Sequence, residues 1–320
     1  MSQRDTITKN DRKHDPRIHV TAEQLRRLGP RARALSLLPH QPVRSVLNGR
    51  HASRLRGRGL NFEELRHYMP GDDVRTIDWK VTARTGAPHV RVYTEERDRA
   101  TLLLVDQRMS MFFGSRVYMK SVVAAEAAAI AAQRVLAQGD RVGGFVFGDE
   151  VIAEHRPQRR AAAVDRLLNS ISKANGLLNA DLQPQSTTEL NDVLQRALRI
   201  AGNNALVLVF SDFDGLDAQS EALIRKLTVA NDLILFSVAD PLAQNLPANM
   251  RAAISDGVVQ ADFDASDPAL RHKVQQAFRN RTRDLERWSR RYGFPLVPLG
   301  TERPALDQLM QQFGLRGGAR

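Results

Sequence analysis

From Thr101 to the end of the chain, short apolar runs alternate with longer segments that have a helical pattern. The runs TLLLVD (101–106), RVGGFVF (141–147), ALVLVFS (205–211) and DLILFSVA (232–239) are nearly continuous, as in strands buried on both faces. Helical segments are predicted over residues 117–138, 159–172, 189–201 and 216–230. Alternation of this kind predicts an α/β fold in which helices cover both faces of a mostly parallel sheet.

The remaining elements are predicted by shorter signals. We expect a short strand over 151–154, an edge strand near 257–263, a long helix over 268–292, a last strand over 294–299 and a closing helix over 303–313. Residues 61–96 contain turn signals and extended stretches such as 89–94, which predict a small β element. The predicted organisation is therefore a basic N-terminal arm (1–54), a β element (55–98) and an α/β domain (99–320).

The N-terminal arm carries most of the net charge of +11. Between Arg12 and Arg58 the chain has twelve Lys or Arg and two acidic residues, Asp15 and Glu23. A solvated basic arm is one interpretation, and an acidic protein, nucleic acid or an anionic membrane surface are alternative partners. No nucleic-acid-binding motif is recognisable, which argues against nucleic acid. Because residues 1–52 contain few long apolar side chains, we expect the arm to be dispensable for folding.

The composition excludes several classes of protein. The chain has no cysteine, so disulfide bonds, thiolate metal sites and cysteine nucleophiles are excluded. No segment has the ~20 consecutive apolar residues of a membrane span, and the first residues lack the apolar core of a secretory signal. We therefore expect a soluble, cytoplasmic protein.

Polar side chains follow two of the predicted strands, at the sheet edge where function collects in α/β proteins. Asp106 and Ser110 follow the first strand, Asp212 follows the strand at 205–211, and Thr188 precedes a helix. Four oxygen ligands of this kind suit Mg²⁺. The sequence has no phosphate-binding loop and no nucleophile elbow, so we expect no catalytic residue, no small-molecule substrate and no enzymatic activity.

This set resembles the metal-ion-dependent adhesion site of von Willebrand factor A domains. The pattern there is Asp-x-Ser-x-Ser after the first strand, a later Thr, and an Asp after a central strand. Arg108 stands where the pattern has its first serine. A guanidinium at this position would supply the positive charge of the ion, which implies a degenerate metal site. The alternatives are a functional Mg²⁺ site, as in a hydrolase that uses Asp106 and Asp212, and two carboxylates that only end strands beside helix N-termini.

The upstream sequence is more specific. RGLNFEELR (58–66), Tyr68, PGDD (70–73), Arg75, IDW (77–79) and TAR (82–84) resemble the signature of the bacterial "domain of unknown function 58" family. The resemblance extends over roughly residues 55–315. In that family the signature precedes a von Willebrand factor A-like domain, and the genes often neighbour MoxR-type AAA+ ATPases. The resemblance implies a protein–protein interaction module, an adaptor or co-chaperone of such an ATPase. A binder of anionic surfaces through the arm is the alternative.

The signature includes three carboxylates, those of Asp72, Asp73 and Asp78, for which we expect no histidine or cysteine partner. We interpret them as a structural knot, with Trp79 packed on the α/β domain and the three carboxylates paired with Arg75, Lys80 and Arg84. A protein-contact surface is the second interpretation, and catalysis by two carboxylates is the third. The structural set comprises Arg66, Gly71, Asp72, Asp73, Arg75, Asp78, Trp79 and Arg84.

The loops at the same sheet edge also provide candidate contacts for a protein partner. The residues Met-Phe-Phe (111–113) follow the first strand and are flanked by charged side chains. An exposed apolar anchor with a charged rim suits a protein interface, whereas helix-start packing is the alternative. The candidate contacts are Arg108, Met111, Phe112, Asp212 and Asp214.

Overall fold

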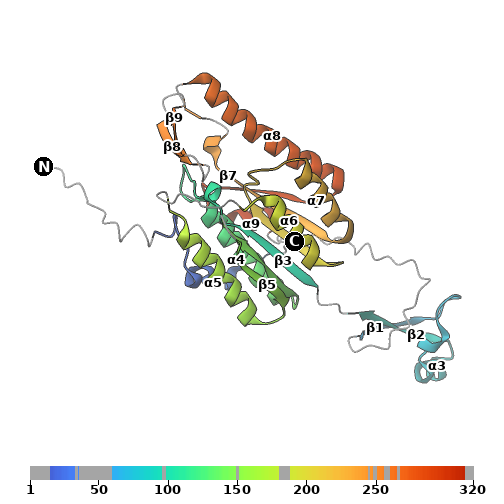
Figure 1. Cartoon of the computed structure of the whole chain (residues 1–320). Helices are drawn as coiled ribbons and strands as arrows, with labels where there is room; N and C mark the ends of the chain where they lie inside the picture. The colour runs from blue at the N-terminus through green and yellow to red at the C-terminus, as the bar shows by residue number, and fades with distance from the viewer. Residues whose placement is uncertain are drawn as a thin grey trace, which may run out of the picture. The chain divides into compact units, whose positions relative to one another are not determined.

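The chain folds into two compact units, which Figure 1 shows as a computed structural model. The structure describes residues 15–32, 35, 60–95, 99–148, 151–179, 188–243, 246–247, 251–255, 260–264 and 267–313. The first unit combines residues 1–37 with residues 99–320, and the second unit is formed by residues 38–98. The second unit is thus inserted into the sequence of the first.

A six-stranded sheet with the order β10–β7–β6–β3–β4–β5 forms the centre of the first unit. The parallel strands are β3 (Ala100–Asp106), β4 (Arg141–Phe147), β6 (Leu206–Ser211), β7 (Asp232–Ala239) and β10 (Leu296–Gly300). The strand β5 (Val151–Gln158) pairs antiparallel with β4 and is longer than the expected 151–154. The predicted α/β fold with a mostly parallel sheet is confirmed.

The central strands are buried along almost their whole length, as their apolar sequences predict. Every residue of β6 is buried, and in β3 only Ala100 is partly exposed. Gly144 of β4 has a φ of +148°, and a Cβ there would lie 1.9 Å from the carbonyl oxygen of Leu103. The close pairing of β3 with β4 therefore requires glycine at this position.

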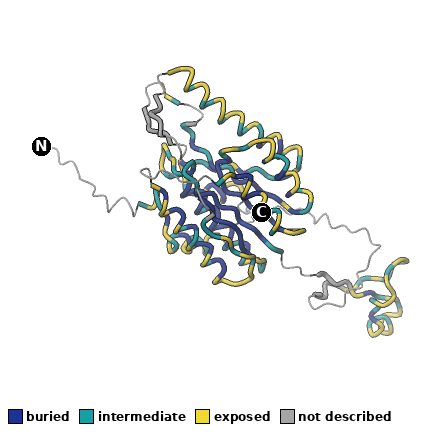
Figure 2. Tube along the Cα trace, viewed as in Figure 1, coloured by how far each residue is buried: buried dark blue, intermediate teal, exposed yellow. Residues whose placement is uncertain are grey.

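Helices cover both faces of the sheet (Figure 1). On one face, α6 (Leu190–Ala201), α7 (Ala218–Ala230) and α8 (Pro268–Tyr292) share a hydrophobic core with the strands. The other face carries α4 (Lys120–Ala137), which contacts α5 (Ala161–Leu177) and α9 (Ala305–Phe313). Buried residues concentrate in the strands and in α4 (Figure 2), as its sequence of small apolar residues predicts. The helices predicted in these regions are confirmed with shifts at their ends.

The N-terminal segment packs against α4 and α5 and is not a solvated arm. Its helices are α1 (Ala22–Arg27) and α2 (Gly29–Ala32), and Thr21 caps α1 through a capping box with Gln24. The side chains of Leu25, Ala32 and Leu35 are completely buried. The interpretation of this segment as a solvated arm is therefore wrong. Much of the remaining arm lies outside the described residues.

A two-stranded ribbon precedes the long helix α8. The strands β8 (Arg251–Ser255) and β9 (Gln260–Asp264) pair with each other and do not join the six-stranded sheet, whereas we expected one edge strand near 257–263. Asp267 caps α8 at its first turn, Pro268 occupies the first position, and Gly293 ends the helix with a φ of +74°. The bounds predicted for this helix are confirmed.

The second unit is a β-hairpin that carries a helix in its connection. The strands β1 (Leu60–His67) and β2 (His89–Glu95) are antiparallel, as the predicted β element requires. A 3₁₀ turn η2 (Val74–Thr76) and α3 (Trp79–Thr85) lie between them. The sequence predicted only turns and extended stretches in this region. Asp78 instead accepts hydrogen bonds from the backbone N–H groups of Lys80 and Val81 and starts a helix.

The carboxylates of the second unit have local structural roles. The carboxylate of Asp72 accepts two hydrogen bonds from Arg66, at 2.7 and 2.8 Å, and Asp73 caps η2. The carboxylate of Asp78 lies 2.7 Å from the guanidinium of Arg91. The cations are therefore Arg66 and Arg91, and the expected pairing with Arg75, Lys80 and Arg84 is wrong. The side chain of Trp79 is 68% exposed, and its packing on the α/β unit stays a prediction.

Candidate functional site

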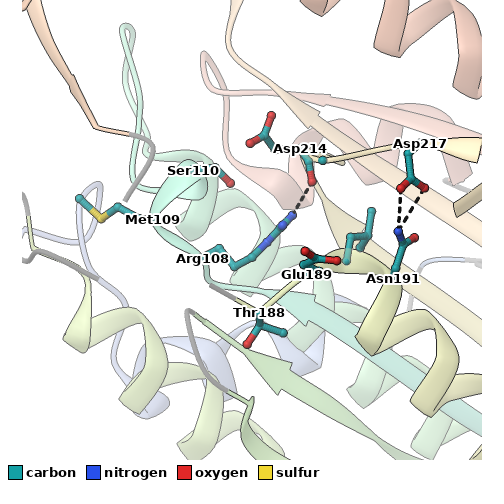
Figure 3. Close-up of a pocket in the computed structure, with 10 residues that line it drawn as sticks. Arg108, Met109, Ser110, Thr188, Glu189, Asn191, Asp214 and Asp217 are labelled. Atoms are coloured by element: carbon teal, nitrogen blue, oxygen red, sulfur yellow. Dashed lines mark hydrogen bonds between the residues drawn. The ribbon is translucent and has the colours of Figure 1, made fainter. Parts of the chain in front are cut away.

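A cleft of about 260 Å³ lies at the carboxyl edge of the sheet (Figure 3). The loops after β3 and β6 and the start of α6 form its walls. Its lining residues are Arg108, Met109, Ser110, Thr188, Glu189, Leu190, Asn191, Asp214, Gly215 and Asp217. The four predicted metal ligands therefore meet here. Ser110 and Thr188 line the cleft, Asp106 is the last residue of β3 and contacts Arg108, and Asp212 follows β6 and contacts Ser110.

Asp106, at the end of β3, is completely buried and is paired with Arg108. The Nη2 atom of Arg108 lies 2.8 Å from Oδ2 of Asp106, and Nε lies 3.1 Å from Oδ1. The hydroxyl of Ser211 donates a further hydrogen bond of 2.6 Å to Oδ2. The guanidinium thus binds both oxygens of the carboxylate, which is the strong form of this ion pair.

Asp212 pairs with a different cation of the chain, Lys120, which is the first residue of α4. The Nζ atom of Lys120 lies 2.6 Å from Oδ2 of Asp212, and both side chains are largely buried. The hydroxyl of Ser110 donates to Oδ1 of Asp212 at 3.4 Å. Each of the two carboxylates at the strand ends is therefore neutralised by a cation of the chain itself.

The turn after Asp212 contacts a third cation, Arg281. Phe213 is fully buried with a φ of +57°, a strained conformation for a residue with a Cβ, and its N–H donates to the hydroxyl of Ser211. The turn places the Asp214 carbonyl 3.1 Å from Nη2 of Arg108 (Figure 3). Arg281 of α8 donates to the Asp212 carbonyl at 3.2 Å and forms an ion pair with Asp214.

The charges of this cluster stabilise one another. Burial by itself lowers the pKa of Arg108, but the negative charge of Asp106 and the hydrogen bonds to it offset burial and raise the pKa above its ordinary value. Burial raises the pKa of Asp212, and the charges of Lys120, Arg281 and Arg108 offset this effect and lower the pKa below its ordinary value. Both groups are therefore held in their charged forms at neutral pH.

This donor set does not fit a divalent cation. A Mg²⁺ ion needs several free oxygen ligands at about 2.1 Å, and here both aspartates already bind cationic nitrogen atoms. In the described part of the chain, no group of three or more His, Asp or Glu side chains is placed to hold a metal ion. The expected degenerate arrangement around Arg108 has a second cation, Lys120, that we did not predict.

A family model described as "Protein of unknown function DUF58" matches residues 64–284, more than half of the chain. The chain belongs to the DUF58 family. The "Uncharacterized protein Mb1516" of Mycobacterium bovis and the "Uncharacterized protein Rv1480" of Mycobacterium tuberculosis are each 30% identical to it over 291 residues, or 89% of this chain and 88% of theirs. The DUF58 match begins in β1 and ends in α8, so both units contribute to it.

Two of the cations in this DUF58 cluster occupy positions in the sequence that are unusual for a positive charge. Lys120 occupies the first turn of α4, where the helix dipole disfavours a positive charge unless an anion lies opposite. Arg281 lies on the same side of α8 as the buried residues Leu285 and Trp288, an unusual place for a charge. They are 92 and 69 residues from Asp212 in the sequence, so neither unusual position identifies Asp212 as the contact.

The candidate partner contacts divide into buried and accessible residues. Met111 is completely buried, so the expectation of an exposed apolar anchor at this position is wrong. Phe112 is half-buried and stacks on His19 with ring centroids 5.7 Å apart. The side chain of Asp214 is 49% exposed, and Phe113 and Val117 are 36% and 43% exposed. Phe113, Val117 and Asp214 are therefore accessible side chains at this edge.

The N-terminal segment is joined to the strand ends by buried hydrogen bonds. The N–H of Val20 donates to Oδ1 of Asn175 at 2.8 Å, and Nδ2 of Asn175 donates to Oε1 of Gln107 at 3.0 Å. Gln107 lies between Asp106 and Arg108, and its side-chain amide donates to the Ser121 carbonyl. This DUF58 chain therefore uses its N-terminal segment to support the site.

None of the described helices is both long and apolar enough to cross a membrane.

Proposed function

We propose that this DUF58 chain is a non-enzymatic protein–protein interaction module, an adaptor or co-chaperone of a MoxR-type AAA+ ATPase. In this proposal the first unit is a von Willebrand factor A-like domain with a degenerate adhesion site. The partner class rests on the family resemblance. The observation that carries the proposal is the pair of internal salt bridges that neutralise Asp106 and Asp212.

The salt bridges favour recognition over hydrolysis. A metal-dependent hydrolase needs carboxylates that bind the metal ion and an open coordination position for water or substrate. Here the two carboxylates bind a buried guanidinium and a buried ammonium group. Fixed ion pairs on a rigid sheet edge hold the surrounding loops in one conformation. A preformed surface of this kind reduces the entropy lost on binding a partner.

Exposed apolar side chains support the same proposal. At the sheet edge, Phe113 and Val117 are accessible beside the charged rim of the cleft. In the second unit, the large apolar side chains of Leu65, Met69, Val74 and Trp79 are 38%, 62%, 58% and 68% exposed. Large exposed apolar side chains that gather in one small unit are typical of interaction surfaces.

The test is a titration of the full chain with the MoxR-type ATPase from the same cell, with and without ATP. We expect Phe113→Ser/Val117→Ser to weaken binding by about tenfold, since each position loses apolar contact area. The control is Val229→Ser, which changes a side chain that is 83% exposed on α7. Failure of the unmodified protein to bind the ATPase under any nucleotide condition would refute the proposed function.

A separate variant tests the second unit. Trp79→Ser changes the most exposed large apolar residue of the hairpin, and its backbone helix cap at Asp78 is untouched. If this variant loses binding while the 113–117 variant retains it, the contact surface belongs to the second unit and not to the sheet edge. Melting temperatures of all variants report whether the fold is intact.

A further inference from the structure

One face of α8 is exposed along most of its length and is unusually basic. Pro268–Tyr292 contains eight Lys or Arg and two acidic residues, Asp284 and Glu286. The helix lies on the outside of the first unit (Figure 1), and its outer side is exposed along the helix (Figure 2). Six exposed residues recur there at intervals of three or four and form what we call the arginine face: His272, Gln276, Arg279, Arg283, Arg287 and Arg290.

The arginine face is opposite the side by which α8 packs on the sheet. Leu285 and Trp288 are buried, and Arg281, on the same side, reaches the cluster around Asp212. At 100° per residue these positions lie about half a turn from Arg279 and Arg283. The packing of α8 therefore fixes the arginine face toward solvent.

The four guanidiniums of the arginine face fall into two groups. In the part of the chain that the structure describes, Arg279 and Arg283 form no ion pair. Arg287 lies 3.1 Å from Asp284, and Arg290 lies 3.9 Å from Glu286, both as exposed pairs within the helix. Exposed pairs of this kind contribute little to stability, so the four side chains can turn to a ligand at low cost.

We propose that the arginine face of α8 binds an acidic helical segment of a protein partner. From Arg279 to Arg290 the guanidiniums are spaced one turn apart over about 17 Å along the helix axis. Carboxylates at intervals of three or four on a facing helix have the same spacing. Guanidinium groups bind carboxylates through two parallel hydrogen bonds, which favours arginine over lysine at such a surface.

The composition of the face favours a protein helix over nucleic acid. It carries no Phe, Tyr or Trp on which an unpaired base can stack, and its one ring is the imidazole of His272. Asp284 and Glu286 border it on the two sides, and their charges repel a phosphate backbone that lies across the helix. A facing helix can instead place its own cations beside them. The proposal rests on the interaction role proposed above and adds the class of the partner surface.

The experiment is a fluorescence anisotropy titration of the full chain with labelled peptides at low salt. The probe is an alanine-rich peptide of about 20 residues, long enough to form a helix, with glutamates one turn apart on a single face. A second peptide has the same composition with the glutamates distributed around the helix. We expect the single-face peptide to bind more tightly, and its affinity to fall as salt is added.

Matched variants locate the binding site. Arg279→Glu/Arg283→Glu should weaken binding of the single-face peptide by about tenfold, and Arg279→Gln/Arg283→Gln should weaken it less. Arg196→Glu/Arg199→Glu makes the same charge change at two exposed positions of α6 and should bind normally. Both α8 variants alter exposed side chains, so we expect their melting temperatures to be unchanged.

Two results would overturn this inference. One is equal binding of the single-face peptide by the unmodified chain and by Arg279→Glu/Arg283→Glu. The other is tighter binding of duplex DNA than of the peptide, with loss of the DNA binding in the same variant, which would assign the face to nucleic acid. The peptide titration uses no ATPase, so its outcome is independent of the test of the proposed function.

Discussion

The Nζ atom of Lys120 lies 2.6 Å from Oδ2 of Asp212, and this contact connects the start of α4 with the end of β6. The side chains are only 13% and 4% exposed. An ammonium group of the chain thus supplies the positive charge beside this carboxylate. A covalently attached cation cannot exchange with solvent ions, so the charge balance of the sheet edge is independent of metal supply.

Replacement of Lys120 by methionine is expected to destabilise the first unit by about 3–5 kcal/mol, because Asp212 stays buried with one cation fewer. The melting temperature should fall by roughly 10 °C for a chain of this size. The matched control is Lys226→Met, which removes an exposed lysine from α7. Equal melting temperatures for the two variants would show that the Lys120 contact adds nothing to stability.

Mg²⁺ should leave the melting temperature of the unmodified protein within about 1 °C of its value in EDTA. A site filled at 100 times its dissociation constant would add about 2.7 kcal/mol, which corresponds to several degrees. Arg108→Ser frees Asp106 and is expected to restore part of a Mg²⁺ response. A clear shift in the unmodified protein would show that Arg108 and Lys120 do not exclude the ion.

The N-terminal segment should be required for a stable first unit. Leu25→Ala is expected to cost about 3 kcal/mol, since Leu25 is completely buried against α4 and α5. Chemical denaturation measures the loss, with Val229→Ala at an exposed position as the control. A chain that starts at Ser53 should be less stable still, and a cooperative transition with unchanged midpoint in that chain would contradict the packing described here.

Glu126 of α4 should make stability depend on pH with the opposite sign to an ordinary carboxylate. Burial raises its pKa, the N–H of Ala305 offsets part of this effect, and Asp307 adds to it. Because the folded pKa is above the unfolded value, the stabilising contribution of Glu126 is present below the unfolded pKa and is lost as pH rises through the folded pKa.

Glu126→Gln removes this titration and keeps an acceptor for the Ala305 N–H. The variant is expected to be more stable than the unmodified protein at pH 8, with a difference that shrinks toward pH 4. Thermal melts across this range measure it, and Glu302→Gln is the control for loss of a carboxylate. A stability difference that does not change with pH would show that Glu126 is not the group whose titration affects stability.

The strands of the first unit were predictable because their burial is encoded locally. The runs at β3, β4, β6 and β7 are nearly continuous in apolar residues and have the length of strands. The helix α3 was not predictable, because its start depends on hydrogen bonds from the backbone N–H groups of Lys80 and Val81 to the Asp78 side chain. The segment otherwise contains turn signals.

The candidate site was predictable in its acidic residues and in Arg108, but not in its other two cations. Asp106 and Asp212 end apolar strands, which places them at one edge of the sheet before any coordinates are known. Lys120, which pairs with Asp212, and Arg281, which donates to the Asp212 carbonyl, come from helices. The sequence pattern does not fix the rotation of these helices about their axes to within one side chain. The packing of the N-terminal segment was missed for a similar reason, because few large apolar residues anchor it and its polar anchor, Asn175, is 155 residues from Val20.

That separation has a consequence for the order of events during synthesis. The N-terminal segment leaves the ribosome before α4 and α5 exist, and at 5–20 residues per second its partner Asn175 follows roughly 8–30 s later. During this interval a strongly apolar segment would be exposed to aggregation. The segment instead carries its charge on Arg17, Arg26, Arg27 and Arg31 and few apolar anchors, a composition that keeps it hydrated until the surface it completes has been made.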